Sequence, residues 1–227
     1  MRFENTSVYN IYNAILGARN PMNSWNKSDS VFNGFNGKIE NTTIGKNDLE
    51  LMQRLIKAGS EHRKFLRQIF ISVDITAPLF WWKEFDTSKV GTVANSTSTM
   101  HKLASTPITI DCFEMGDFEN LQFVGEDVFG GRCQKDISSM WEHLIIYLEE
   151  LRKLYNETKD KRYWKEVIRL LPESWLQKRT ITMNYENVLN MISHRSHHKL
   201  TEWSIDFINW CKSLPYANEL LFLEKGE

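Results

Sequence analysis

The sequence predicts an α+β protein that is mostly helical and has a small sheet. Two stretches, residues 137–155 and 159–171, repeat apolar residues at the three-to-four spacing of amphipathic helices. Residues 68–76 alternate apolar and polar side chains, which is typical of a half-buried strand. No internal repeat, low-complexity tract or linker divides the chain. We therefore expect a single domain over residues 1–227.

The N-terminal part of the chain predicts two helices joined by a loop. Residues 5–18 place apolar side chains on one face of a helix. Residues 23–45 are rich in Asn, Ser and Gly and predict the loop. Asn47 and Glu50 have the spacing of a capping box at the start of the second helix, and Gly59 ends it.

The remaining elements follow from apolar spacing. Residues 180–183 predict a short strand, and residues 184–195 and 199–213 predict two helices. The strand over 68–76 directs four apolar side chains to one face: Ile69, Ile71, Val73 and Ile75. The apolar face expected for the helix over 137–155 consists of Met140, Leu144, Tyr147, Leu148, Leu151 and Leu154.

Charge and composition exclude some functional classes. The net charge of −1 argues against a dedicated nucleic-acid binder, which usually carries a basic surplus. No apolar run approaches the ~18 residues that would span a bilayer, so no membrane segment is expected. The start of the chain lacks the pattern of a signal peptide. Three widely separated cysteines without CxxC spacing argue against a disulfide framework and a zinc site. We therefore expect a cytoplasmic protein.

The segment 184–203 carries the richest set of polar side chains. Asn187, Asn190, Met191 and His194 are expected on one helical face, and Arg195 ends the helix. A planar guanidinium suits phosphate, and amides suit ring edges or ribose, so this face is a candidate ligand surface. An ordinary solvated polar face explains the same pattern. His194 and His198 have HxxxH spacing but no carboxylate or cysteine at a metal-ligand spacing, so no metal is expected.

A second candidate is the hydroxyl-rich segment 87–100. Short hydroxyl side chains and backbone N–H groups before a helix can cradle a phosphate, although a plain Ser/Thr-rich loop explains the segment equally. Neither GxGxxG nor GxxxxGK[ST] is present. The nearby Trp81 and Trp82 predict a core or a subunit interface.

The order of these features resembles the flavin-dependent thymidylate synthase family over most of the chain. Gly17–Pro21 stands at the place of the family's Ala-Arg-x-Ser element, and Glu61–Arg67 leads into a strand that ends at Ala77-Pro78. Residues 87–100 correspond to the signature Arg-His-Arg-x-x-Ser-x-Asn-Glu-x-Ser-x-Arg-Tyr, with Asn95 and Ser98 matching after one inserted residue. The best-spaced block is C-terminal: Leu171-Pro172, Thr182-Met183-Asn184, Asn190 and Arg195.

The chain departs from the family pattern at several charged positions. Only Lys89 keeps a charge at the Arg-His-Arg triplet, and Ser96 replaces the following Glu. The family's later Arg is Met100, and an Arg of the C-terminal helix is replaced by Glu186. His198 lies one position before the family's C-terminal His.

The resemblance implies a central twisted sheet with flanking helices, in a homotetramer whose active sites lie between subunits. It implies reductive methylation of dUMP to dTMP with methylenetetrahydrofolate, FAD and NADPH, and no protein nucleophile. Arg195 would be the catalytic residue, holding the pyrimidine or polarising its carbonyl. The substrate would be bound by Ser96, Thr97, Ser98, Thr99, Arg169 and Arg195. The flavin would be bound by Asn184 and Asn190, with His62, Arg67, Lys89 and His198 as further contacts.

The departures leave two alternatives open. One is a family-like enzyme that alkylates C5 of another pyrimidine nucleotide. The other is a nucleotide-binding homologue without catalytic activity.

Overall fold

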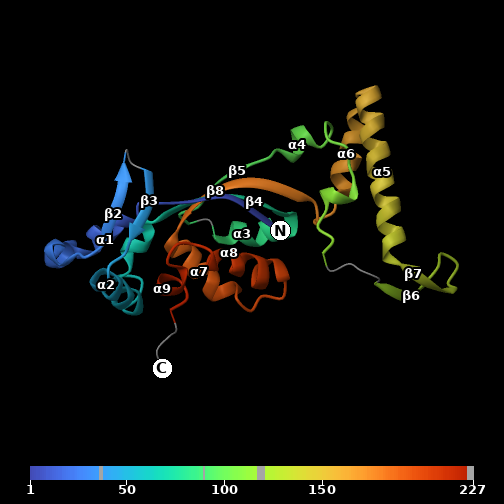
Figure 1. The fold of residues 1–227 in the computed structure, drawn as a ribbon. Coiled ribbons are helices and arrows are strands. Elements are labelled where there is room, and N and C mark those ends of the chain that lie inside the picture. Colours follow the sequence, from blue (N-terminus) through green and yellow to red (C-terminus); the bar gives the residue numbers. More distant parts are fainter. Residues whose placement is uncertain (36–37, 89, 117–120, 224–227) are drawn as a thin grey trace. The chain divides into compact units, whose positions relative to one another are not determined.

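The computed structural model describes residues 1–35, 38–88, 90–116 and 121–223 (Figure 1). Its internal contacts divide the chain into two compact units. Unit 1 comprises Met1–Ile75, Lys83–Asn95 and Arg179–Glu227, and unit 2 comprises Thr76–Trp82 and Ser96–Lys178.

The main sheet has four strands in the order β1-β4-β8-β5. They are β1 (Arg2–Tyr9), β4 (Phe70–Pro78), β8 (Leu176–Asn184) and β5 (Val93–Ser96). The strand predicted at 68–76 is confirmed, and its four predicted inward residues have no exposed surface: Ile69, Ile71, Val73 and Ile75. The run predicted at 180–183 is the end of the longer β8. The α+β class with a small sheet and flanking helices is therefore confirmed.

The helix predicted over residues 5–18 is wrong at its start. Residues up to Tyr9 form β1, and helix α1 (Ile11–Arg19) begins only after Asn10, whose φ of 70° breaks the helical path. Contacts from distant parts of unit 1 stabilise the strand. The ring of Phe3 stacks on Trp210 at 5.0 Å, and Trp210 Nε1 donates to Thr6 Oγ1 at 3.1 Å. These tertiary contacts outweigh the local helical pattern.

The loop predicted over residues 23–45 is also wrong in part. Two short turns, η1 (Asn20–Met22) and η2 (Trp25–Lys27), precede an antiparallel hairpin of β2 (Val31–Phe35) and β3 (Lys38–Thr43). The hairpin is rich in Asn and Thr and has a register shift between Asn33 and Gly34, so it lacks a clean alternating pattern. The ring of Phe32 stacks on Tyr12 of α1 at 4.9 Å.

Helix α2 (Lys46–Lys57) is capped from outside rather than by the predicted Asn47–Glu50 box. Gly45 occupies the N-cap position and makes no side-chain cap. The carboxylate of Asp29 instead accepts hydrogen bonds from the backbone N–H groups of Asn47 at 2.9 Å and Asp48 at 3.1 Å. Gly59 follows the helix with a φ of 105°, which agrees with its predicted role.

A buried ion pair joins α1 to α2. Arg19 Nε lies 2.5 Å from Asp48 Oδ1, and the two side chains are 4% and 0% exposed. The second Asp48 oxygen accepts from the hydroxyls of Ser28 at 2.7 Å and Ser30 at 2.6 Å. Burial alone would raise the pKa of Asp48, but the hydrogen bonds from Ser30 and Ser28 and the Arg19 guanidinium hold it below its ordinary value. Arg19, which stood in the resemblance's first motif, is thus a structural residue here.

The C-terminal part of unit 1 is helical, as predicted. It contains α7 (Tyr185–Arg195), a π-helical turn η6 (Glu202–Phe207), α8 (Ile208–Lys212) and α9 (Ala217–Leu220). Helices α7 and α8 lie along one face of the strands, and Figure 1 shows them beneath β4 and β8. Helix α3 (Leu79–Phe85) carries the predicted aromatic cluster, and Trp81 and Trp82 are buried.

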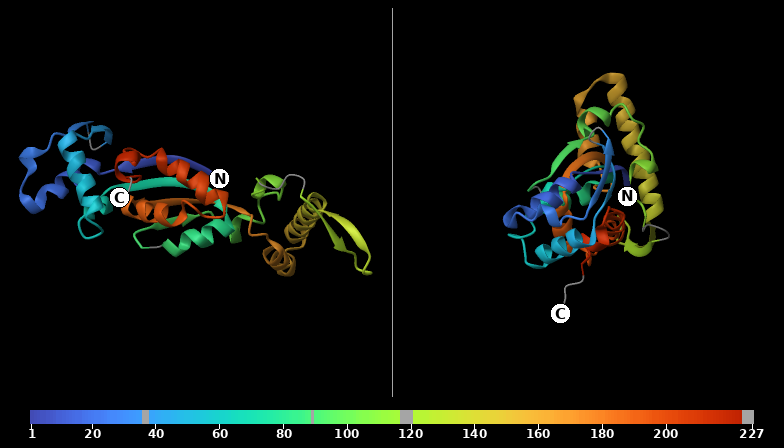
Figure 2. Two further views of the ribbon diagram at one scale, coloured as in Figure 1. Left: turned by 90° about the horizontal axis from the view of Figure 1, so that it is seen from below. Right: turned by 60° about the vertical axis from the view of Figure 1, so that its left-hand side comes forward.

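Unit 2 is built around two helices, α5 (Ile137–Thr158) and α6 (Lys161–Leu170). They lie side by side in Figures 1 and 2, with the hairpin of β6 (Gln122–Glu126) and β7 (Arg132–Asp136) leading into α5. Asp136 and Asp160 cap the two helices through their side chains. The core of the unit consists of Leu103, Ile108, Phe113, Leu148, Leu151 and Val167.

The apolar face predicted for α5 is only half buried. Leu148 and Leu151 are in the core, but Met140, Tyr147 and Leu154 are exposed. The core-facing side also includes Trp141 and Ile145, which were not predicted there. At 3.6 residues per turn, Met140, Tyr147 and Leu154 lie along one edge of the predicted face, and the core contacts the other edge, which carries Trp141, Ile145 and Leu148.

A charged clamp fixes the loop before α5 against that helix. Arg152 donates to both oxygens of Glu149 at 2.6 and 2.7 Å and to the carbonyl of Ala104 at 2.9 Å. Glu149 also accepts from the N–H of Ile108 at 2.8 Å. The hydrogen bonds from Arg152 hold the pKa of Glu149 below its ordinary value.

Arg152→Ala is therefore expected to lower the free energy of unfolding by about 2 kcal/mol, the scale of hydrogen bonds to charged groups. Urea denaturation would measure the change. Arg162→Ala is the matched control, because its ion pair with Asp160 joins an arginine that is 88% exposed. An equal loss in both variants would contradict a specific role for the clamp.

Candidate functional site

The predicted site residues fall into two sets. Unit 1 holds the predicted flavin contacts and the predicted catalytic arginine, namely His62, Arg67, Asn184, Asn190, Arg195 and His198. Unit 2 holds the proposed phosphate contacts, namely Ser96, Thr97, Ser98, Thr99 and Arg169. Lys89 lies outside the described residues. Each set is described within its own unit.

Asn184 and Asn187 close the start of helix α7. Asn184 Oδ1 accepts from the N–H of Asn187 at 3.0 Å, and Asn187 Oδ1 accepts from the N–H of Asn184 at 3.1 Å. This is a reciprocal capping box. Asn187 Nδ2 also donates to the carbonyl of Val90 at 2.6 Å. Both polar groups of the Asn187 side chain are therefore used in hydrogen bonds within the protein. The Nδ2 group of Asn184 makes no hydrogen bond among the described residues.

The turn at Gly91 lies directly on this asparagine pair. A Cβ at position 91 would stand 3.1 Å from Asn187 Oδ1 and 3.3 Å from Asn184 Nδ2. The φ of +80° also favours glycine at this position. The glycine thus allows residues 90–91 to approach the start of α7 closely.

Arg63 contacts two residues of α7, although the sequence predicted no role for it. The short helix η3 (Lys64–Gln68) packs on α7, and Arg63 precedes it. Arg63 Nε lies 3.0 Å from both carboxylate oxygens of Glu186, and its Nη2 donates to Asn190 Oδ1 at 3.3 Å. Glu186 is 6% exposed, and a buried carboxylate needs a charged partner. Arg63 is that partner. The available signal was the adjacency of Arg63 to His62 in the motif.

His62 and Arg67 lie beside Arg63 and face solvent. Both side chains are exposed. Arg67 makes one long hydrogen bond, from Nη2 to the carbonyl of Ser60 at 3.4 Å. Its guanidinium therefore keeps donors for an anionic ligand.

Arg195 is held in a defined position at the end of α7. Its Nη1 lies 2.8 Å from Glu84 Oε2, and its guanidinium lies over the Trp203 ring at 4.9 Å. Nη2 makes longer contacts with the Glu84 carbonyl and Thr87 Oγ1, both at 3.4 Å. The Nε–H makes no hydrogen bond among the described residues. The side chain is 16% exposed, so it is fixed yet reachable.

The rest of the predicted polar face of α7 is split. Asn190 and His194 are exposed, but Met191 is buried. The ring of His198 is oriented by the chain itself, because its Nδ1 accepts from the N–H of Leu200 at 3.2 Å. The helix thus presents Asn190 and His194 to solvent rather than one continuous ligand face.

In unit 2 the serine and threonine run is pinned by β8. The N–H of Thr97 donates to the carbonyl of Lys178 at 2.9 Å, and Gln177 Nε2 donates to the carbonyl of Thr97 at 2.9 Å and to Thr99 Oγ1 at 3.3 Å. Ser96 and Thr97 are exposed. Their hydroxyls, rather than the N–H of Thr97, are therefore the groups available to an anion.

Arg169 lies near the end of α6 and is 57% exposed. It forms an ion pair with Glu166 one turn earlier. Such an exposed pair costs little to break, so the guanidinium can exchange this partner for another anion.

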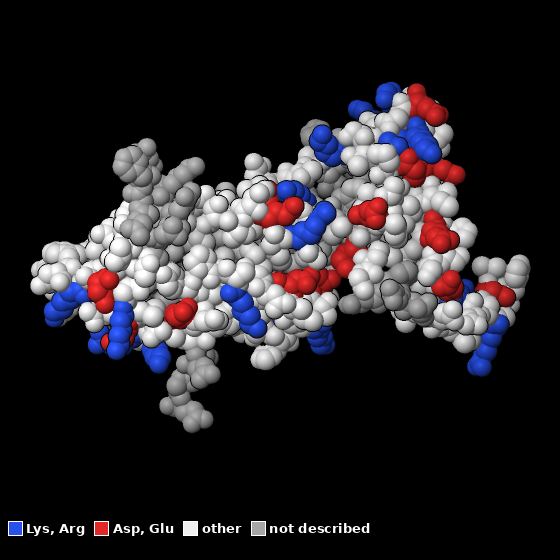
Figure 3. Space-filling view, viewed as in Figure 1, with Lys and Arg blue, Asp and Glu red and all other residues white. Residues whose placement is uncertain are grey.

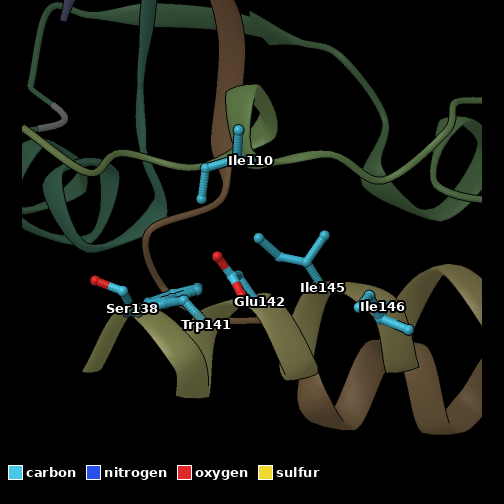
Figure 4. A pocket seen from close by; sticks show the side chains of 6 residues that line it. All are labelled: Ile110, Ser138, Trp141, Glu142, Ile145 and Ile146. Carbon is cyan, nitrogen blue, oxygen red and sulfur yellow. The ribbon is translucent and has the colours of Figure 1, made fainter. Parts of the chain in front are cut away.

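A cavity of about 430 Å³ lies elsewhere in unit 2 (Figure 4). Ile110 faces a row of side chains from the first turns of α5, including Trp141, Glu142 and Ile145. None of the predicted site residues lines it. Its lining is mostly apolar, so it does not suit a nucleotide phosphate.

Neither a metal-binding cluster nor a membrane-spanning helix occurs in the described part of the chain. No group of three or more His, Cys, Asp and Glu side chains there is arranged to hold a metal ion. No helix there has the length and apolarity needed to cross a membrane. On the face drawn in Figure 3, basic and acidic side chains are interspersed.

Sequence comparison alone finds no relative, since no family model and no curated protein matches the chain. Solved structures do match. Two structures of the flavin-dependent thymidylate synthase ThyX from Helicobacter pylori, both with FAD and dUMP, superimpose with a TM-score of 0.67 at 18% identity. The matches cover 100% of both chains in one case and 99% of both in the other. The chain has the fold of a flavin-dependent thymidylate synthase.

The thymidylate synthase fold is shared by a third match. A UMP/dUMP methylase, PolB from Streptomyces cacaoi, bound with 5-Br dUMP, superimposes with a TM-score of 0.58 at 14% identity. The match covers 97% of this chain and 93% of PolB. The fold expected from the sequence resemblance is therefore confirmed.

Glu186 stands where the sequence resemblance places an arginine of the family. Arg63 Nη2 lies 3.0 Å from its Oε1. The pair has no net charge, whereas Arg67 of the same motif is exposed and makes only one long hydrogen bond.

Proposed function

We propose that this protein is a flavin-dependent thymidylate synthase that converts dUMP to dTMP by reductive methylation. The observation that carries the proposal is the full-length match to a thymidylate synthase complexed with FAD and dUMP. Methylenetetrahydrofolate is the proposed carbon donor and NADPH the proposed reductant. We further propose a single functional domain over residues 1–227, assembled as a cytoplasmic homotetramer.

The residues of unit 1 fit a bound FAD. A dinucleotide cofactor needs cationic donors for its pyrophosphate and amide donors for its ring or ribose. Exposed Arg67 supplies the first, with the exposed His62 ring as a further polar contact, and Asn190 and the Nδ2 group of Asn184 supply the second. Lys89 and His198 are further proposed contacts. When bound, the flavin would supply the hydride that completes the methyl group.

The substrate residues would act by charge and position. We propose that Arg195, oriented by Glu84 and Trp203, directs its Nε–H donor to the pyrimidine and stabilises charge at its carbonyl oxygen. The hydroxyls of Ser96–Thr99 would donate hydrogen bonds to the substrate phosphate, and Arg169 would add positive charge. No step requires a protein nucleophile.

The test has two stages. Purified protein incubated with FAD and passed through gel filtration is expected to retain a flavin absorbance spectrum. With FAD, NADPH and methylenetetrahydrofolate, it is expected to release tritium from C5-labelled dUMP and to form dTMP. Absence of both flavin retention and tritium release would overturn the proposal.

A second candidate is C5 alkylation of another pyrimidine nucleotide. It is favoured by the similarity to a UMP/dUMP methylase and by Ser96 in place of the family Glu. The same tritium assay with labelled UMP and dCMP separates the two. Release from UMP or dCMP without release from dUMP would favour this candidate, and flavin or dUMP binding without any release would indicate a homologue without catalytic activity.

A further inference from the structure

Arg63 connects a buried carboxylate to an exposed amide in unit 1. Its Nε lies 3.0 Å from both carboxylate oxygens of Glu186, and its Nη2 donates to Asn190 Oδ1 at 3.3 Å. The Glu186 and Arg63 side chains are 8% and 21% exposed, whereas Asn190 is exposed. One guanidinium thus joins a group that is shielded from solvent to a group that a ligand can reach.

The backbone of Arg63 is held in place as well as its side chain. Its N–H donates to the carbonyl of Gly59 at 3.1 Å, and its carbonyl accepts from the N–H of Leu66 at 3.0 Å. Leu66 has no exposed surface, so this turn cannot shift without disturbing the core. Arg63 therefore needs little further ordering when a ligand binds nearby.

The guanidinium determines which way the Asn190 amide faces. An arginine side chain has only donors, so the Asn190 atom that contacts it must be the oxygen Oδ1. The Nδ2 group lies on the other side of the amide and makes no hydrogen bond among the described residues. Without such a partner an amide can present either atom, because its two orientations have nearly the same shape.

The amide of Asn184 has the same polarity. Its Oδ1 accepts from the N–H of Asn187 at 3.0 Å, which leaves Nδ2 as its unused group. The unused amide groups of Asn184 and Asn190 are therefore both donors. A ligand that binds them must present hydrogen-bond acceptors.

We infer that Arg63 is a positioning residue for the flavin. Held by Glu186, it turns the Asn190 amide so that Nδ2 donates to an oxygen acceptor of the cofactor. The inference rests on the proposed function, because it takes a flavin as the ligand. A donor that is oriented in advance loses less conformational entropy on binding than a freely rotating amide, so Arg63 strengthens flavin binding without touching the flavin.

A double-mutant cycle in FAD affinity tests whether Arg63 acts through Asn190. Arg63→Lys keeps the charge that Glu186 needs, but an ammonium lacks the planar fork that reaches Glu186 and Asn190 together. Arg63→Lys and Asn190→Ala are each expected to weaken FAD binding about 3- to 10-fold, the scale of one hydrogen bond. The double variant is expected to bind FAD no more weakly than Asn190→Ala alone.

The dissociation constants would be measured by titrating FAD and following its fluorescence. If the two single losses multiply in the double variant, Arg63 acts independently of Asn190 and the inference is wrong. Lys64→Ala is the matched control, because Lys64 is adjacent to Arg63 and 66% exposed. It is expected to leave FAD affinity unchanged, and a loss equal to that of Arg63→Lys would also contradict the inference.

Asn190→Asp tests the direction of the donor. The carboxylate keeps an oxygen for Arg63 and replaces the outward Nδ2 group with a second oxygen. Because two acceptors would then face each other, FAD binding is expected to be weaker than in Asn190→Ala. The position is exposed, so the variant is expected to fold. FAD affinity equal to or above that of Asn190→Ala would show that the outward group is not a donor to the flavin.

Riboflavin distinguishes the two kinds of oxygen acceptor, because it shares the ring system of FAD and lacks its phosphates. An equal loss for riboflavin and FAD in Arg63→Lys places the acceptor on the shared part, and a loss confined to FAD places it on the phosphates. Either result supports the inference, and no loss for either ligand contradicts it. A wild-type protein that takes up no flavin would overturn the proposed function and this inference together. Flavin uptake with multiplying losses would overturn the inference alone.

Discussion

Arg19→Met is expected to lower the free energy of unfolding by about 3–5 kcal/mol, the scale for removing one partner of a buried ion pair. Asp48 has no exposed surface and would keep its charge inside unit 1 without the guanidinium. The same carboxylate accepts hydrogen bonds from the Ser28 and Ser30 hydroxyls. A displaced Asp48 side chain would therefore also weaken the segment before β2. Urea or thermal denaturation would measure the loss.

Lys46→Met is the matched control for that variant. Lys46 lies in the same helix as Asp48 and forms a 4.0 Å pair with Glu50, but the lysine is 86% exposed. Its loss is expected to have a much smaller effect, because water screens exposed pairs. If the two variants lose similar stability, the buried pair does not hold α1 to α2.

The same site predicts a pH dependence. The folded-state pKa of Asp48 is lowered, so the folded protein binds this proton more weakly than the unfolded chain. The carboxylate therefore contributes stability above its unfolded pKa of about 3.9, and that contribution is lost as the pH falls through the folded pKa. Asp48→Asn is expected to flatten the decline in stability below about pH 4. If the stability of Asp48→Asn still declines below about pH 4 as it does in the wild type, other carboxylates cause the decline.

Arg195→Ala is expected to weaken dUMP binding by roughly 10- to 150-fold, which corresponds to about 1.5–3 kcal/mol for a lost charge-assisted hydrogen bond. The side chain is fixed by Glu84 and Trp203, so little ordering is needed when a ligand binds. Titration calorimetry with dUMP on the flavin-loaded protein would measure the change.

Lys199→Ala controls for the loss of one positive charge close to Arg195 in the sequence. Lys199 is exposed, and its removal is expected to leave dUMP affinity nearly unchanged. Unfolding should be measured for both variants. If Arg195→Ala reduces stability but leaves dUMP affinity unchanged, Arg195 only joins α7 to Glu84 and Trp203, and the proposed substrate contact is wrong.

Elements with a strong local pattern could be predicted from the sequence alone. The alternation of Ile69, Ile71, Val73 and Ile75 defines β4, and apolar spacing defines α5 and α7. These elements can be predicted because side-chain directions repeat with a fixed local period in a strand or a helix. The order of motifs also predicted the thymidylate synthase fold, although no family model matches the chain.

Other features depend on contacts between residues far apart in the sequence, and only the tertiary structure decided them. Residues before Asn10 form a strand because Phe3 and Thr6 contact Trp210. Arg63 belongs to the candidate site because η3 packs on α7 and brings it to Glu186. The sequence by itself determined which residues could carry charge, cap a helix or fill a core. Tertiary packing decided which of these residues contact one another, because no local period in the sequence indicates contacts between distant side chains.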